Sequence, residues 1–151
     1  MSCDNSMQLH NQLNVAQDKY TYFLLAVAAS AIAFATQITK ESSFSYSLIP
    51  LGLAVLVWGL SFYCGCQNIR YSNTNTIANI ELLNLESGEY PEFSKNPKMI
   101  QVITEGIKSA FESNSVKLCS YSNWQFRFLI IGSVMFIVWH IFEMAIRTIG
   151  N

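Results

Sequence analysis

Charge is scarce in this sequence. Only 13% of its 151 residues are Asp, Glu, Lys or Arg, whereas a soluble domain of this size usually has about 25%. The formal net charge is −1, which argues against binding nucleic acid by general electrostatic attraction. Hydrophobic residues make up 51% of the chain and the mean hydropathy is positive. The chain is therefore predicted to build its core with the help of lipid.

Recognisable chemistry is scarce too. The four cysteines are too scattered for a disulfide framework, and no Cys/His pair has zinc-site spacing. The sequence has only two histidines and lacks a Gly-rich phosphate loop, a His-Glu-x-x-His motif and a Gly-x-Ser-x-Gly elbow. We therefore predict no enzyme, no metal and no cofactor.

What the sequence does have is three long apolar runs. Residues 20–39 and 47–66 are each twenty residues without a charge, and 128–142 is a third uncharged run that reaches a full span at 146. Twenty helical residues cover about 30 Å, the thickness of a hydrocarbon core. The first run is predicted to be a retained span, because a signal peptide needs a short positive leader and 1–19 is mostly polar with two acids. The predicted fold class is an all-α integral membrane protein with three transmembrane helices, the third one ending at 146.

The distribution of basic residues predicts the orientation. The connection 67–127 holds six of the nine Lys and Arg residues, whereas the loop 40–46 holds one. By the positive-inside rule, the connection and the N-terminal segment 1–19 are cytoplasmic, while the loop 40–46 and the tail 147–151 are external. A plasma or inner membrane is the expected location.

The cytoplasmic connection is predicted to be an antiparallel helical hairpin that extends spans two and three. Residues 87–97 contain Gly, two Pro and small polar residues, which indicates a turn. Apolar residues at helical spacing on both sides predict the packing of the hairpin; they are Ile77, Ile80, Ile100, Ile103, Ile107 and Phe111. Segment 1–19 is predicted to be a third cytoplasmic helix along this hairpin; the alternative is a helix lying flat on the membrane, which usually has a more basic polar face.

Small residues recur at three- and four-residue steps in span one. Because apolar side chains gain nothing by leaving lipid for one another, small residues promote contact by letting backbones approach closely. We interpret these residues, with two glycines of span two, as a helix-packing or oligomer seam; they are Ala26, Ala29, Ser30, Ala33, Gly52 and Gly59. The alternative is packing within one three-helix bundle, but three spans make a thin bundle and favour a homo-oligomer.

Four polar residues near the ends of the spans are candidates for an ion or proton path or a gate. Gln37 lies one turn from the end of span one. His140, Glu143 and Arg147 share one helix face, and histidine titrates near neutral pH. The alternative is structural: Glu143 and Arg147 pair at the outer headgroups, and His140 lies one turn deeper.

Together these features lead to two hypotheses. The first is a self-associating membrane protein whose hairpin senses a cytoplasmic protein partner or small ligand, and whose membrane part forms a pore or perturbs the bilayer. The second is a non-conducting anchor or auxiliary subunit that docks a cytoplasmic partner. The layout resembles that of small bacterial membrane effectors, but a layout alone carries no function over.

Overall fold

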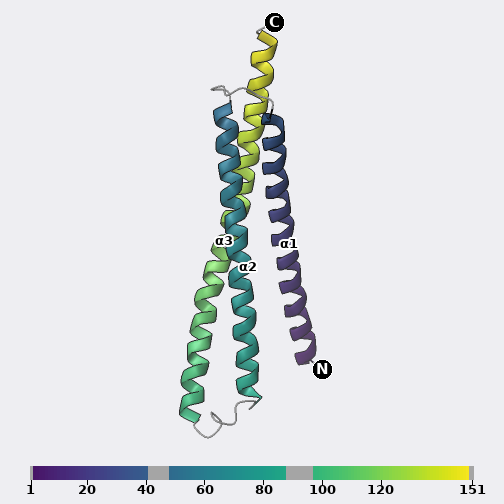
Figure 1. Ribbon diagram of the computed structural model, residues 1–151. Coiled ribbons are helices and arrows are strands. Elements are labelled where there is room, and N and C mark those ends of the chain that lie inside the picture. The colour runs from purple at the N-terminus through teal and green to yellow at the C-terminus, as the bar shows by residue number, and fades with distance from the viewer. Residues whose placement is uncertain (1, 41–47, 88–96, 150–151) are drawn as a thin grey trace. The chain divides into compact units, whose positions relative to one another are not determined.

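The computed structural model consists of three long helices (Figure 1). It describes residues 2–40, 48–87 and 97–149, apart from the side chains of residues 2–14, 86, 97, 147 and 149. The helices are α1 (Ser2–Thr39), α2 (Ile49–Glu86) and α3 (Pro97–Ile149). Each is long and apolar enough to cross a membrane, over Val15–Thr39, Ile49–Leu85 and Lys98–Ile146. The prediction of an all-α protein with three helices long and apolar enough to span a membrane is confirmed.

The helices are longer than the predicted spans because nothing breaks them at the predicted boundaries. The N-terminal segment and span one form a single helix, and α2 continues through residues 67–86, which contain neither proline nor glycine. Pro97 begins α3, where its missing N–H costs no helical hydrogen bond. The predicted loop 40–46 and the turn 87–97 lie almost entirely outside the described residues.

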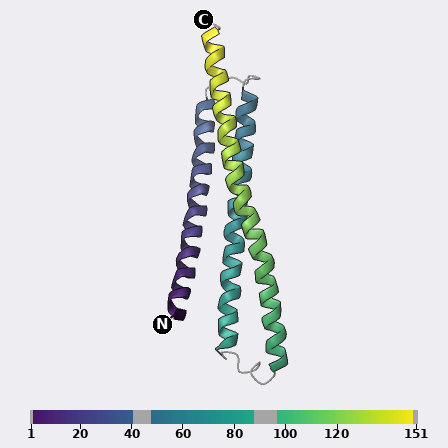
Figure 2. The same cartoon turned by 180° about the vertical axis from the view of Figure 1, so that it is seen from behind.

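The chain divides into two compact units. Unit 1 is Met1–Cys66 with Ser122–Asn151, and unit 2 is Gln67–Tyr121. In unit 1 the three helices run side by side, as both views show (Figures 1 and 2). Each helix contributes to one buried hydrophobic cluster, which consists of Leu24, Ala28, Ala35, Leu51, Trp58, Leu129 and Trp139.

Unit 2 is built from α2 and α3 alone. The rings of Tyr71 and Tyr121 stack with their centroids 5.6 Å apart, and Asn75 Nδ2 donates a hydrogen bond of 3.2 Å to Ser115 Oγ. Position 71 thus pairs with 121 and position 75 with 115, so the two helices run antiparallel in this unit.

Candidate functional site

The small residues of span one are divided between two faces of α1. Ala28 and Ala35 are 0% and 1% exposed and belong to the core of unit 1. Ala26, Ala29, Ser30 and Ala33, the predicted seam residues, are all exposed. Gln37 is exposed as well and follows Ala33 by four residues, which puts it on the same face. The two helices that pack against α1 therefore leave uncovered the face on which the predicted seam lies.

Two other glycines of unit 1 lie against side chains of neighbouring helices. A Cβ on Gly132 of α3 would lie 2.6 Å from Trp58 Cδ1 and Nε1, and one on Gly65 of α2 would lie 2.6 Å from Gln125 Nε2. A Cβ on Gly52 or Gly59 would meet nothing within 4 Å. Gly132 is not among the predicted seam residues; its place in the third apolar run, seven residues after Gln125, was the available signal.

Three neutral polar side chains are buried where the helices of unit 1 meet. Ser61 Oγ donates a 2.7 Å hydrogen bond to the backbone oxygen of Gln125, and Gln125 Nε2 donates a 3.4 Å bond to the backbone oxygen of Thr21. Thr21 Oγ1 bonds within its own helix, to Gln17 O at 3.1 Å. Gln125 is 1% exposed, and its Oε1 has no hydrogen-bond partner. In lipid, such inter-helix bonds hold helices in register and contribute about 0.6 kcal/mol each.

Aromatic rings fill the interior toward the other end of unit 1. The Phe136 ring lies 5.7 Å from the Trp58 ring, 5.7 Å from the Trp139 ring and 6.2 Å from the Phe34 ring. Trp58 Nε1 donates a 3.3 Å hydrogen bond to Leu129 O, whereas the buried Nε1 of Trp139 has no partner. Because both tryptophans are buried, rings rather than polar side chains occupy the space between the three helices at this end of unit 1.

The predicted histidine site is only partly described. His140 is exposed and stacks on Phe136, with ring centroids 6.4 Å apart and planes inclined by 2°. Glu143 is half-buried, and the side chain of Arg147 lies outside the described residues. Within the described part of the chain, no group of three or more His, Cys, Asp or Glu side chains could hold a metal ion.

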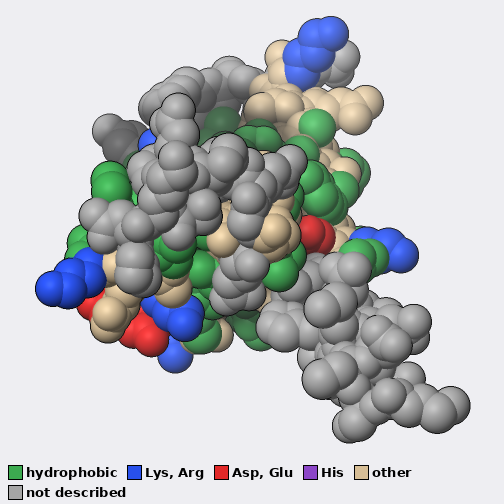
Figure 3. Space-filling model, turned by 90° about the horizontal axis from the view of Figure 1, so that it is seen from below, with side chains coloured by type: hydrophobic (Ala, Val, Ile, Leu, Met, Phe, Trp, Pro, Cys, Tyr) green, Lys and Arg blue, Asp and Glu red, His purple; other side chains and the backbone are tan. Residues whose placement is uncertain are grey.

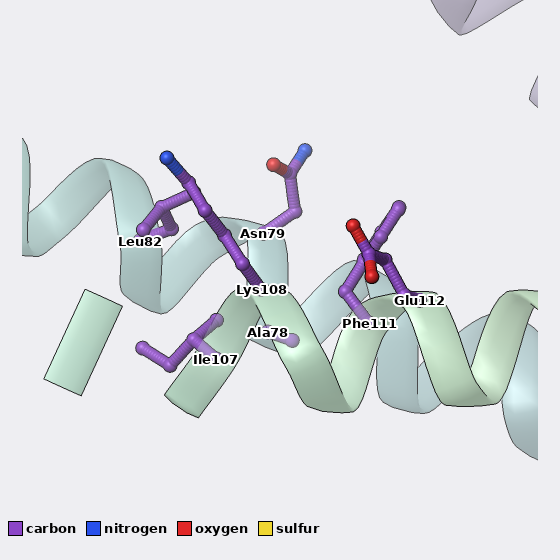
Figure 4. Close-up of a pocket in the computed structure, with 7 residues that line it drawn as sticks. All are labelled: Ala78, Asn79, Leu82, Ile107, Lys108, Phe111 and Glu112. Atoms are coloured by element: carbon purple, nitrogen blue, oxygen red, sulfur yellow. The ribbon is translucent and has the colours of Figure 1, made fainter. Parts of the chain in front are cut away.

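In unit 2 a groove lies between α2 and α3, with a volume of about 190 Å³. Its lining is Ala78, Asn79, Leu82, Ile107, Lys108, Phe111 and Glu112. The polar ends of Asn79, Lys108 and Glu112 point to one side, away from Ala78 and Ile107 (Figure 4). The groove thus combines an apolar floor with one positive and one negative side chain.

The residues predicted to pack the hairpin differ widely in burial. Ile100, Ile103 and Ile107 are half-buried, whereas Ile77 is 60% exposed and Ile80 and Phe111 are also exposed. On α2, Tyr71 and Asn75 contact α3, and Ala78 and Leu82 line the groove between the two helices. These four positions are spaced by four, three and four residues, as expected for one helix face. Asn75 is polar and Tyr71 carries a hydroxyl group, so a search for apolar residues at helical spacing did not predict this face.

No protein-family model, curated protein or solved structure matches this chain.

Proposed function

We propose that this chain is a small integral membrane protein that self-associates through the outward face of α1, and that its assembled membrane part forms a pore or perturbs the bilayer. The observation that carries the proposal is the exposure of Ala26, Ala29, Ser30 and Ala33, on a helix whose opposite face is already packed against its neighbours. Four small side chains that face lipid make few contacts and contribute little to stability. If they face another copy of the chain, they allow the two helix backbones to approach closely.

Any conducting path lies between copies rather than inside one. The interior of unit 1 is filled by Trp58, Trp139 and Phe136, and its buried polar side chains are neutral. The outward face of α1 also carries polar Ser30 and Gln37. Around the axis of a ring of α1 helices, these two residues supply hydrogen-bonding groups in a low-dielectric environment.

Self-association is tested by substituting the outward face. Ala29→Leu and Ala33→Leu each add bulk where close approach is needed, so they are expected to raise the dissociation constant about tenfold or more, measured by cross-linking across a range of protein-to-lipid ratios. Val27→Leu is the matched control, since Val27 is also exposed on α1 but lies about a quarter turn from the small residues. An Ala29→Leu protein that assembles as well as the control contradicts the proposal.

The proposed topology has the N-terminus and the 87–97 turn in the cytoplasm and the C-terminus outside, as the basic residues predict. The groove of unit 2 is then accessible to a cytoplasmic partner or ligand. Tags at the two ends test this topology; labelling of both from the same side of intact cells contradicts it.

The second candidate is a non-conducting anchor that docks another protein. It is favoured by the exposed apolar side chains of unit 2, namely Ile77, Ile80, Leu83, Val102 and Val116, which face no described partner.

Ion and dye flux across liposomes separates the two candidates. A pore-former gives flux that grows with protein density and falls with Ala29→Leu, whereas an anchor gives none. His140→Ala is measured alongside; an effect no larger than that of Ile141→Ala, an exposed neighbour, indicates that His140 is structural.

A further inference from the structure

A lysine and two tyrosines form a compact cluster on unit 2. The stacked rings of Tyr71 and Tyr121 are inclined by only 15°, and Lys117 Nζ lies 5.5 Å from the centroid of the Tyr71 ring. Both tyrosines are half-buried and Lys117 is exposed. The attraction between an ammonium group and a ring face limits where Lys117 extends, while its N–H groups stay available to an acceptor.

Tyr71 of this cluster lies at the level of lipid headgroups if the uncharged runs span the membrane. Tyr71 follows the end of the second run, Cys66, by five residues, which is about 7.5 Å along a helix. The headgroup layer is about 5–8 Å thick on each side of the hydrocarbon core. Tyrosine is enriched at this depth because its ring is apolar and its hydroxyl is polar.

The charges on either side of the cluster are segregated. Residues 67–76 and 114–127 contain three bases, Arg70, Lys117 and Arg127, and no acid. All six acids of the connection lie between Glu81 and Glu112, farther along the chain from both spans. Basic and acidic side chains both appear on the face of the molecule seen from below (Figure 3). The segments next to the membrane therefore present only positive charge, which attracts anionic lipid.

We propose that Lys117, held over the ring of Tyr71 in the Tyr71–Tyr121 stack, binds the phosphate of an anionic lipid headgroup. The ammonium group donates to the phosphate oxygens, and the rings keep it at the depth of that phosphate. This inference rests on the membrane insertion of the proposed function but not on self-association, so either can fail without the other.

The test measures which lipid the full-length protein retains. The protein is reconstituted in nanodiscs of phosphatidylcholine and phosphatidylglycerol, and the ratio of the two lipids bound after extraction is measured by native mass spectrometry. Lys117→Gln is expected to lower the preference for phosphatidylglycerol about fivefold, the effect of one lysine at the membrane surface. Lys98→Gln is the control, because Lys98 is an exposed lysine of α3 far from the cluster in sequence, and it is expected to match the wild type.

Two outcomes overturn the inference. One is a Lys117→Gln protein that retains phosphatidylglycerol as well as the Lys98→Gln protein does. The other is displacement of the lipid by inorganic phosphate at equal concentration, which assigns the site to free phosphate instead. Cross-linking of the same samples reports self-association separately, and Lys117→Gln is expected to leave it unchanged.

Discussion

Replacing Gly132 with alanine tests a close contact between α2 and α3 in unit 1. The added Cβ would lie 2.6 Å from two atoms of the buried Trp58 ring, and a rigid indole cannot yield as the end of a flexible side chain can. Overpacking of this kind costs about 1–3 kcal/mol. Displacing the ring also removes the 3.3 Å hydrogen bond from Trp58 Nε1 to Leu129 O, about 1 kcal/mol. Alanine regains at most about 1 kcal/mol of helix propensity, so the free energy of unfolding is expected to fall by about 1–3 kcal/mol.

Two further glycines give an internal scale for this prediction. Gly65→Ala meets the flexible ends of Gln125 and Leu25, so its cost is expected to be smaller than that of Gly132→Ala. Gly52→Ala meets nothing within 4 Å and is expected to be neutral or slightly stabilising. Unfolding of the dilute, monomeric protein by SDS in mixed micelles, followed by circular dichroism, measures all three. Equal stability of the Gly132→Ala and Gly52→Ala proteins would refute the reasoning.

The remaining predictions concern hydrogen bonds and the surface of unit 2. Ser61→Ala removes the 2.7 Å bond to the Gln125 backbone and is expected to lower the free energy of unfolding by about 0.6–1.5 kcal/mol in the same titration; no change would mean that the bond contributes nothing. Gln125→Met keeps the length of the side chain but removes a buried oxygen that has no hydrogen-bond partner. The free energy of unfolding is therefore expected to stay within about 1 kcal/mol of the wild type or to rise. A larger loss would indicate that the 3.4 Å hydrogen bond to Thr21 contributes more to stability than its length suggests. Ile77→Ser is expected to change the free energy of unfolding by less than about 0.5 kcal/mol, because the side chain is mostly exposed. Ile107→Ser, at a half-buried position in the groove, is expected to lower it by more. Thermal unfolding measures both variants, and the reverse order of stability would contradict the described packing.

The three long apolar helices were predictable because they depend on local composition. A run of twenty uncharged residues makes a long apolar helix whatever packs against it, and Pro97 marks a helix start through its own missing N–H. The faces of those helices were less predictable. Ala28 and Ala29 are adjacent and chemically identical, yet Ala28 is buried and Ala29 is exposed. Small residues occur on several faces of α1, so the sequence pattern does not indicate which face is buried.

The candidate sites depend still more on partners that are distant in the sequence. The Ile77 and Ile80 stripe is apolar, yet α3 packs on the face with Tyr71 and Asn75, where a ring stack and an amide–hydroxyl bond replace hydrophobic contact. Gln125, two residues before Arg127, has the sequence context of a membrane entrance, yet it is almost completely buried because Gly65 leaves room for its amide.

By itself, the sequence determined that this protein is helical, that three of its segments are apolar over the length of a bilayer, and that its charges lie mostly between the second and third of them. Each of these properties is a sum over neighbouring residues. Only the tertiary structure decided which alanines face the core, which glycines lie against a tryptophan or an amide, and which two tyrosines stack with a lysine over one of the rings. Those properties require residues up to about a hundred positions apart to meet, and their register is fixed by the packing of whole helices rather than by any local pattern.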